Sequence, residues 1–596
     1  MEGFQWEQRF KKRIGYVAGL LAVMASAVIC KQASLQLFDY GQYAERAAGQ
    51  QISYVTVRSN RGDIQDRYGK PLATSSEWKS IAIRPWQVKH PEMVADMLSK
   101  VLRIDRDTLL QRIRTEKSFF YVKRVASDDE RGQLQEWKKY RIEQEKKLDP
   151  HYEGDPLKDE GVESDVESIG KRFYPQGRVA SHLLGFVSDD ERGLEGVEAS
   201  YDCELAGRAG EERRRIDVAN NSIASPVQLT KAVPGKHVQL TIDAVIQYTA
   251  ESALRKAVAV RHAKGGICLV MDARTGEVLA SAVAPDYEPT HFEKADKKVR
   301  RNRAITDAYE PGSVFKTFTA AAALKNGATP NSVYSCPSTM TIDGCTIGNA
   351  SDGLYTKGTE TLADIIRYSF NTGTAYVAMD LGREKLARTL YDFGFGKATD
   401  VGLQGEADGI LGDWHDWSQI DTCTRSYGQA ATATPIQLCS GMQAIANGGV
   451  RMQPRLIKAI VDDDGNVVEN FPIKEVSRPI SAANARDLTE ILCGVVASGT
   501  GKPGAVPGYK VAGKTGTADV VDEERGGYAQ GRHNSSFLGF APAGDPRIVV
   551  LVKLEDPMPV YFGGLVAGPV FKEVCSKVLP YLGVPPTAGY NQLLEE

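Results

Sequence analysis

The chain has 596 residues, of which 42% are hydrophobic and 25% are charged. These values are ordinary for a folded protein that is long enough for two or more domains. The formal net charge of −3 indicates no nucleic-acid-binding surface, so we expect no nucleic acid among its partners. Nine cysteines are too few, and odd in number, for a disulfide scaffold. The eight histidines are scattered without metal-ligand spacing, so we expect no metal or other cofactor.

An apolar segment follows a cluster of basic residues at the amino terminus. The uncharged run covers residues 14–30 and is ended by Lys31. Its length is at the lower limit for a membrane-spanning helix, and the preceding basic residues place the amino terminus in the cytoplasm. A cleaved signal peptide is the alternative, because Ala25-Ser26-Ala27 resembles a cleavage site. We favour an uncleaved signal-anchor at residues 14–36 after a cytoplasmic tail at 1–13, because the apolar run continues past that triplet. The basic residues are Arg9, Lys11, Lys12 and Arg13.

The region after the apolar segment contains predicted strands and helices but no group of residues that indicates catalysis or ligand binding. Residues 61–67 and 69–73 predict a strand and a glycine turn, and residues 77–123 alternate between strand-like and helical patterns. Residues 143–168 are dense in Lys, Asp and Glu with few apolar side chains, so we expect a solvated, mobile insertion there. His182 is predicted to pack or to cap a helix rather than to act in catalysis.

A domain junction is predicted at Val233-Pro-Gly-Lys236. Beyond it, residues 243–259 have helical periodicity. The apolar runs at 266–271 and 278–283 are joined by the turn at 272–276 and predict a hairpin.

A second block of strands is predicted towards the carboxyl end. Residues 509–512 and 519–521 flank a Lys-Thr-Gly turn, and residues 536–541 and 547–553 form a further pair. An antiparallel sheet built from both ends of a domain, with helices between, is an α+β fold. The Lys-Thr-Gly strand opens this block and is a good candidate for an edge strand, which can bind an extended peptide.

A serine and a lysine lie at the start of the most distinctive helix. Ser313 follows a Pro-Gly turn and precedes the small-residue run at 317–324, which ends at Asn326-Gly327. This pattern predicts a buried helix with Ser313 in its first turn. Lys316 lies three residues further on, so both side chains share one face. A serine hydroxyl needs a base to become a good nucleophile, and a desolvated lysine can be that base.

Two further motifs distinguish this Ser-x-x-Lys from its repetitions at Ser76–Lys79 and Ser168–Lys171, where a solvated surface is the simpler interpretation. Ser369-Phe370-Asn371 is the only Ser-x-Asn in the chain, and Lys514–Thr517 holds its only Lys-Thr-Gly. The three motifs follow the order used by penicillin-recognising acyl-serine enzymes.

Cys336 and Cys345 bracket a short turn-like segment at 337–344. They could form a disulfide if this segment folds as a hairpin. Two free, partly buried thiols are the favoured interpretation.

Together these segments resemble the class B penicillin-binding proteins, the monofunctional peptidoglycan D,D-transpeptidases of bacteria. The resemblance runs from the signal-anchor to about Lys572 and spares only the charged insertion. It includes residues 61–73, which resemble the motif at the start of the family's non-catalytic pedestal, and 302–313, which lead into the Ser-x-x-Lys motif. Residues 508–518 and 561–567 look most like the cell-division (septal) branch, while the elongation branch and a sporulation paralogue stay open.

The resemblance implies an α+β transpeptidase domain at 235–596, with an antiparallel sheet covered by helices on both sides. It also implies an extended, dimerisation-type pedestal at 37–234. The implied activity is cross-linking of peptidoglycan stem peptides through an acyl-serine intermediate in septal cell-wall synthesis, with β-lactam antibiotics as inhibitors. The implied partners are a membrane glycosyltransferase of the shape-and-division class and other division proteins. The implied location is the inner (plasma) membrane, crossed once, with the catalytic domain outside the cytoplasm.

Catalytic roles carry over by motif position. Ser313 would form an acyl-enzyme with the penultimate D-alanine and expel the terminal one. Lys316 would be the general base, with a pKa lowered by burial and by the charge of Lys514. Ser369 would pass a proton to the leaving amine, and Asn371 would hold Lys316 and the substrate amide.

Substrate-binding roles fall mainly on the Lys-Thr-Gly segment. Backbone N–H groups of Ser313 and Thr517 would form an oxyanion hole, typically worth about 3 kcal/mol per donor. Lys514, Thr515 and Thr517 would receive the peptide carboxylate, and Gly516 belongs to the same binding segment. The acyl group would then pass to the side-chain amine of a second stem peptide. The middle residue of Ser-x-Asn, Phe370, is larger than usual in the family and is expected to affect packing rather than chemistry.

Four rival functions are weaker. A serine β-lactamase needs a further carboxylate base, such as a Glu-x-x-Leu-Asn motif, which we do not find. A D,D-carboxypeptidase would share the nucleophile but not the pedestal motif at 61–73. A β-lactam sensor would acylate without cross-linking, and a pure division scaffold would lack the intact Ser313, Lys316 and Lys514 present here.

Overall fold

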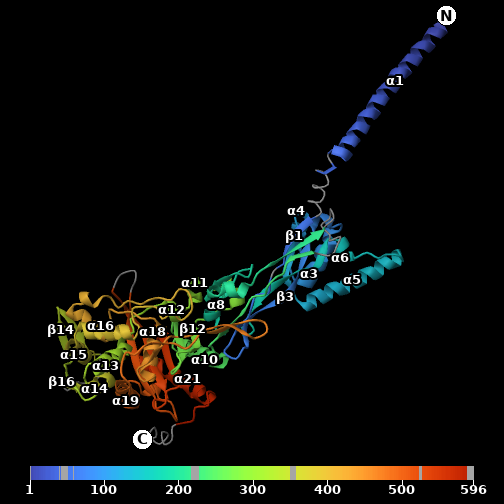
Figure 1. Ribbon diagram of the computed structural model, residues 1–596. Helices are drawn as coiled ribbons and strands as arrows, with labels where there is room; N and C mark the ends of the chain where they lie inside the picture. The colour runs from blue at the N-terminus through green and yellow to red at the C-terminus, as the bar shows by residue number, and fades with distance from the viewer. Residues whose placement is uncertain are drawn as a thin grey trace. The chain divides into compact units, whose positions relative to one another are not determined.

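Figure 1 shows the computed structural model, which describes residues 2–38, 40–41, 52–57, 59–215, 227–349, 358–521 and 527–586. The chain forms two compact units. The first combines Met1–Asn60 with Gly207–Pro234, and the second combines Arg61–Ala206 with Gly235–Glu596.

The first unit contains the amino-terminal helix and a small sheet. Helix α1 spans Glu2–Ala33 and continues as a π-helical turn, η1, over Ser34–Phe38. The segment Phe10–Leu37 is long and apolar enough to cross a membrane, and an 18-residue window within it has a mean hydropathy of 1.9. The signal-anchor predicted at 14–36 lies within this segment. The sheet has the order β1-β8-β9, with strands at Ile52–Val57, Gly210–Arg215 and Val227–Thr230.

In the second unit, a mixed sheet joins segments that are far apart in the sequence. Its order is β19-β18-β10-β2-β3-β4, and β5 also pairs with β3. The strand and glycine turn predicted for 61–73 are confirmed, because β2 pairs with β3 across a turn in which Gly69 has a φ of 83°. The strands are β2 (Ile64–Gln65), β3 (Pro71–Ile83), β4 (Phe120–Ala126), β5 (Val162–Phe173), β10 (His237–Leu240), β18 (Ile457–Val461) and β19 (Val467–Asn470).

Helices pack against β3, β4 and β5 around a core of buried side chains such as Ile81, Leu98 and Leu134. The prediction of a mobile insertion at 143–168 is wrong. Helix α5 extends through Leu148, and β5 is paired with β3 from Val162 onward. Amino-acid composition does not reveal these elements. Helix α5 is charged but is stabilised by a capping box and one buried leucine, and β5 is stabilised by backbone hydrogen bonds. The helices are α3 (Pro91–Leu102), α4 (Arg106–Thr115), α5 (Asp128–Leu148) and α6 (Pro156–Asp159).

A buried ion cluster holds the segment after β5 against residue 61. The Glu198 carboxylate is fully buried and pairs with Arg61 at 2.8 Å and with Arg172 at 2.6 Å. Arg61 also pairs with Asp202 at 2.7 Å. Short elements surround the cluster: α7 (Ser181–Leu184), β6 (Phe186–Val187), β7 (Gly193–Glu195), α8 (Gly196–Ser200) and α9 (Asp202–Ala206).

Replacing Glu198 by Ala should lower the free energy of unfolding by about 3–5 kcal/mol, because two buried guanidinium groups lose their shared carboxylate. Thermal denaturation of the purified protein measures this effect. Glu384→Ala is the matched control, since it removes an exposed pair with Arg388 that contributes less than about 1 kcal/mol. Equal, small shifts for both variants would contradict a stabilising role for the cluster.

His182 is buried beside this region, where its ring contacts Tyr287 edge-on and its Nε2 lies 2.7 Å from the carbonyl oxygen of Val299. Burial lowers the pKa of His182 to about 4. The prediction that it packs is therefore confirmed.

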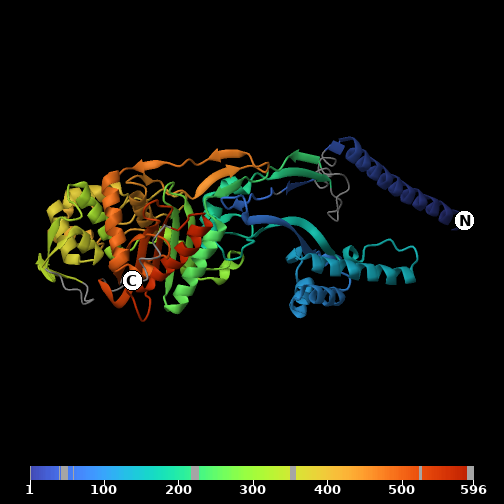
Figure 2. The same cartoon turned by 90° about the horizontal axis from the view of Figure 1, so that it is seen from below.

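The second sheet of this unit is entirely antiparallel and has the order β12-β11-β23-β22-β21. Helices cover both of its faces, as predicted: α10 and α21 contribute to the core on one face, and α13 and α18 to the core on the other (Figures 1 and 2). The pattern follows from strand alternation, because Cys268 and Val270 of β11 face the first core while Ile267 and Leu269 face the second. These elements are β11 (Gly265–Asp272), β12 (Val278–Ala284), β21 (Ala512–Val521), β22 (Tyr528–Ala541), β23 (Ile548–Glu555), α10 (Ala244–Val260), α13 (Lys316–Lys325), α18 (Pro435–Ala446) and α21 (Gly568–Tyr581).

Smaller elements complete the unit around the second sheet. Strand pairs β13–β16, β14–β15 and β17–β20 lie outside the two large sheets. The remaining elements are α11 (Lys297–Arg300), α12 (Arg303–Thr306), β13 (Val333–Cys336), β14 (Thr339–Ile342), β15 (Cys345–Gly348), β16 (Gly358–Thr361), α14 (Leu362–Arg367), α15 (Asn371–Leu381), α16 (Arg383–Asp392), α17 (Gln419–Ser426), β17 (Arg451–Met452), β20 (Glu475–Ser477), α19 (Ala482–Ser498) and α20 (Gly563–Val566).

Candidate active site

Ser313 lies in a 3-10 turn, η4 (Gly312–Phe315), that leads directly into α13. The predicted helix is confirmed, although the serine precedes the α-helical part by one tight turn. Gly312 has a φ of 56°, and a Cβ atom on it would lie 2.8 Å from the carbonyl oxygen of Thr517. Only glycine lets the turn approach β21 this closely, so the Pro-Gly step brings Ser313 next to the edge of the sheet.

Ser369 and Asn371 lie where α14 gives way to α15. Ser369 has a φ of 62°, a left-handed conformation that is uncommon for residues other than glycine and is frequent at functional sites. Phe370 is 4% exposed and packs beside Tyr368, with 5.9 Å between ring centroids. Its ring therefore contributes to packing, while the flanking Ser369 and Asn371 make the polar contacts described below.

The Lys-Thr-Gly segment lies inside a continuous strand. The prediction of a turn there is wrong, because β21 pairs with β22 on both sides of it, from Ala512↔Phe540 to Asp519↔His533. Glycine is needed for close approach rather than for turning. A Cβ on Gly516 would lie 2.4 Å from the Ser536 Oγ and 2.8 Å from a methyl group of Val314. Within the described part of the sheet β21 has one neighbour, β22, so the prediction of an edge strand is confirmed.

The side chains of the three motifs converge on the Ser369 hydroxyl. The Lys316 Nζ donates to the Ser369 carbonyl oxygen at 2.5 Å and to the Asn371 Oδ1 at 2.6 Å, and it lies 3.3 Å from the Ser369 Oγ. The Lys514 Nζ donates to the Ser369 Oγ at 2.9 Å and to the Thr515 carbonyl oxygen at 3.2 Å. The hydroxyl of Ser369 therefore lies between two lysine amines.

Both lysines are fully buried, which changes their protonation. Burial, together with the positive charge of Lys514, holds the pKa of Lys316 well below its ordinary value. Burial also lowers the pKa of Lys514 to about 7. An unprotonated amine at neutral pH is what a general base requires.

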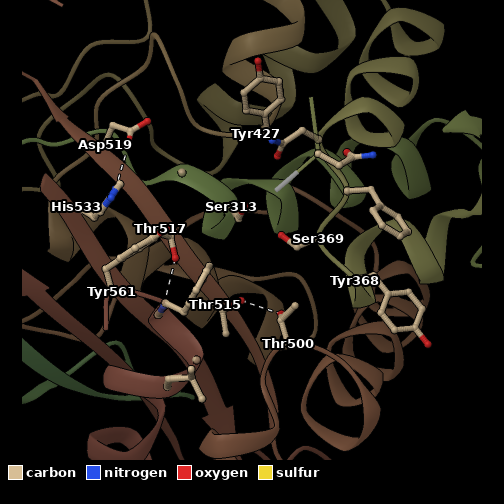
Figure 3. Close-up of a pocket in the computed structure, with 18 of the residues that line it drawn as sticks. Ser313, Tyr368, Ser369, Tyr427, Thr500, Thr515, Thr517, Asp519, His533 and Tyr561 are labelled. Atoms are coloured by element: carbon tan, nitrogen blue, oxygen red, sulfur yellow. Dashed lines mark hydrogen bonds and ion pairs between the residues drawn. The ribbon is translucent and has the colours of Figure 1, made fainter. Parts of the chain in front are cut away.

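Ser313, Ser369, Asn371, Thr515 and Thr517 line one cavity of about 690 Å³. Figure 3 shows the labelled side chains around it, with Ser313 and Ser369 on one side and Thr515 and Thr517 of β21 on another. Hydrogen bonds join the wall together: the Gly563 N–H donates to the Thr517 Oγ1 at 3.2 Å, and the Thr500 and Thr515 hydroxyls lie 2.8 Å apart. The cavity is thus lined by every candidate site residue except the two buried lysines and Gly516.

Several cavity residues were not singled out from the sequence. Asp519 could have been found, because strand alternation places it on the same side as Thr515 and Thr517. The others carry no local signal of their own: Tyr368 precedes the Ser-x-Asn motif, His533 lies opposite Asp519 on β22, and the rest come from segments outside the three motifs. They are Asn349, Tyr368, Tyr427, Gln429, Thr500 and His533.

The thiols of Cys336 and Cys345 are free, and only Cys336 is buried. The segment between them contains β14, which forms a hairpin with β15, and Ile342 of β14 pairs with Cys345 of β15. The interpretation of two free thiols is therefore confirmed, but the expected partial burial is wrong for Cys345, which is exposed. In the described ranges, no group of three or more His, Cys, Asp or Glu side chains is placed to hold a metal ion.

Two family descriptions match the chain. Residues 266–576 match the penicillin-binding protein transpeptidase domain, and residues 56–240 match the penicillin-binding protein dimerisation domain. The first match contains all three motifs.

Two named proteins are similar over most of their lengths. Stage V sporulation protein D of Bacillus subtilis is 33% identical over 533 residues, which cover 88% of this chain and 79% of that protein. Peptidoglycan D,D-transpeptidase FtsI of Escherichia coli K12 is 30% identical over 589 residues, which cover 97% of this chain and 93% of that protein.

A solved structure supports the fold. Penicillin binding protein 3 of Mycobacterium tuberculosis, complexed with aztreonam, has 27% identity to this chain and a TM-score of 0.67. The match covers 90% of this chain and 99% of the solved one. The motifs, the two family matches and the full-length relatives agree, and this chain belongs to the class B penicillin-binding proteins.

Proposed function

We propose that this protein is a peptidoglycan D,D-transpeptidase, which cross-links stem peptides through an acyl-enzyme on Ser313. The observation that carries the proposal is the environment of Lys316. Two N–H bonds of a neutral amine are satisfied by the Ser369 carbonyl oxygen and the Asn371 Oδ1. The lone pair of the amine is then left to accept a proton, from the Ser369 hydroxyl 3.3 Å away or from the Ser313 hydroxyl.

The first half-reaction would acylate the serine. Lys316 takes the proton from the Ser313 hydroxyl as the Oγ attacks the carbonyl carbon of the penultimate D-alanine. The carbon–nitrogen bond to the terminal D-alanine then breaks. The leaving nitrogen receives a proton from the Ser369 hydroxyl, which regains one from Lys316. The contacts of Ser369 with both lysine amines support this relay.

The second half-reaction would regenerate the serine. The side-chain amine of a second stem peptide attacks the acyl carbon, the bond from that carbon to the Ser313 oxygen breaks, and the proton that the amine loses passes to the Ser313 oxygen. Water must compete poorly with the amine for the product to be a cross-link.

Substrate would be held along β21. The backbone N–H groups of Ser313 and Thr517 would stabilise the developing oxyanion, typically by about 3 kcal/mol per donor. Thr515 and Thr517 line the cavity next to Gly516, and we assign them, with Lys514, to the peptide carboxylate. An arriving carboxylate favours the charged form of Lys514, whose pKa burial lowers to about 7.

The setting of this chemistry is the outer face of a membrane. We propose a cytoplasmic tail at 1–13, a signal-anchor at 14–36, a non-catalytic pedestal at 37–234 and a transpeptidase domain at 235–596. The basic residues before the apolar helix support the orientation. We assign the enzyme to the plasma membrane and to septal wall synthesis, with a glycosyltransferase of the shape-and-division class and other division proteins as partners. The FtsI relative supports this assignment.

Mass spectrometry of the purified protein after incubation with benzylpenicillin tests the proposal. We expect one adduct on the peptide that contains Ser313, and slow release of that adduct over time. An adduct on another residue would contradict the assigned nucleophile. Rapid release would indicate a β-lactamase. Slow release without cross-linking of a peptide donor to an amine acceptor would indicate a sensor.

A further inference from the structure

The active-site cavity continues beyond Thr517 into a group of residues that the chemistry above does not use. Thr515, Thr517 and Asp519 are alternate residues of β21 and all three line the cavity. Asp519 lies opposite His533 of β22, and its carboxylate is 2.9 Å from the His533 Nδ1 (Figure 3). The edge strand therefore carries a carboxylate two residues past the expected oxyanion hole.

The imidazole of His533 is held in place by its neighbours. Its ring stacks on that of Tyr561, with 4.0 Å between centroids and 24° between planes. The His533 side chain is 18% exposed, whereas the Asp519 side chain is 43% exposed. His533 thus acts as a positioning residue that orients Asp519, while part of the carboxylate stays open to the cavity.

A second carboxylate lies close to the first. Glu310, three residues before Ser313, accepts hydrogen bonds from the Ala430 N–H at 2.8 Å and from the Tyr528 hydroxyl at 3.0 Å. Burial raises the pKa of Glu310, and the negative charge of Asp519 adds to the rise. Among the described residues, no lysine or arginine forms an ion pair with either carboxylate. Asp519 lines the cavity, and Glu310, which is not one of the lining residues, adds a second carboxyl group beside it, so these two groups attract a cation and repel an anion.

The direction of β21 determines which part of a bound peptide lies at the Asp519 end of the cavity. A peptide that adds to the edge of β21 in the antiparallel sense runs opposite to it. If its carboxylate lies near Lys514 and its reacting carbonyl near Thr517, the preceding residue lies towards Asp519, at about 3.4 Å per residue. A long side chain on that residue extends over the Asp519 carboxylate.

We propose that Asp519, supported by Glu310, binds the side-chain ammonium of the residue that precedes the reacting D-alanine in the donor stem peptide. This inference rests on the proposed function. It specifies the substrate class as donor peptides in which the residue before the reacting D-alanine carries an unblocked side-chain amine. A carboxylate at this position would be repelled by Asp519, and an acetylated amine would lose the attraction.

Two thioester donors test this subsite in the complete protein. Both have an Nα-acetyl-L-lysyl-D-alanyl-D-thiolactate skeleton, and the second is also acetylated on its side-chain amine. The rate of acylation, expressed as kcat/KM, should be about fivefold higher for the free amine, as expected for one partly exposed ion pair. In Asp519→Asn this ratio should fall below about twofold, and Asp519→Glu should restore most of it.

Asp545→Asn is the matched control, because Asp545 lies in the exposed turn after β22 and pairs with Arg274. This variant should keep the wild-type ratio. Equal rates for the two donors in the wild type, or an unchanged ratio in Asp519→Asn, would overturn the subsite while leaving the transpeptidase intact. Failure of both donors and of benzylpenicillin to acylate the wild type would overturn the proposed function and the subsite together.

Discussion

Ser313→Ala should abolish covalent labelling by a fluorescent penicillin, because the methyl side chain has no oxygen with which to form the acyl bond. The serine is only partly buried, so the free energy of unfolding should change by less than about 0.5 kcal/mol. Gel fluorescence after incubation measures the label, and thermal denaturation measures the fold.

Ser335→Ala is the matched control for this experiment. Ser335 is an exposed residue of β13 and does not line the cavity. Its variant should be labelled like the wild type. Full labelling of Ser313→Ala would mean that another residue is the nucleophile, and the proposed chemistry would fail.

Lys316→Ala should reduce the rate of acylation by about 10²–10⁴-fold, the range typical for removal of a general base. The remaining pH profile should also change. In the wild type, the lowered pKa of Lys316 keeps the amine unprotonated below its ordinary range. As the pH falls through that lowered pKa the amine gains a proton, so acylation should slow on the acid side. In Lys316→Ala, acylation should be slow at every pH and should no longer slow further as the pH falls through this range.

The two other Ser-x-x-Lys motifs supply controls for the lysine. Lys79 and Lys171 are exposed and lie in the strands β3 and β5, away from any helix start. Lys79→Ala and Lys171→Ala should therefore acylate at the wild-type rate, measured by stopped-flow or quenched labelling. A loss in Lys171→Ala equal to that in Lys316→Ala would contradict the choice of motif.

The burial of the lysines explains why these effects should be large. A surface lysine would stay protonated at neutral pH, whereas Lys316 is fully buried near a second buried amine, that of Lys514. Burying the side chains of two neighbouring lysines is energetically unfavourable unless their amines are neutral or hydrogen bonded. The contacts with Ser369 and Asn371 meet that need.

Local sequence was sufficient for the elements whose signals are contained in a short segment. The helix after Ser313 and the hairpin at 266–283 were predicted close to their observed bounds. The apolar segment at 14–36 was also identified, although the helix that contains most of it begins at Glu2. Side-chain periodicity, glycine punctuation and apolar length report directly on such elements.

Local sequence failed where pairing partners are far apart. The charged region at 143–168 looked mobile because its strand is stabilised by backbone pairing with β3, about 90 residues earlier. The Lys-Thr-Gly segment was predicted as a turn because a glycine within a short motif often indicates a turn. Here Gly516 lies in an extended strand, where its missing side chain leaves room for Val314 and Ser536 to pack against the backbone.

The catalytic groups could be identified from the amino-acid sequence: one serine with a lysine three residues later, followed by Ser-x-Asn and Lys-Thr-Gly. The burial of Lys316 and Lys514 on either side of the Ser369 hydroxyl, and the extension of the cavity by Asp519 and His533, became apparent in the folded chain. Residue types and short spacings can be read directly from a sequence. Burial, proton affinity and cavity shape depend instead on contacts between separate segments, such as those that join Ser369 to Lys316 and Lys514 across 53 and 145 residues of chain.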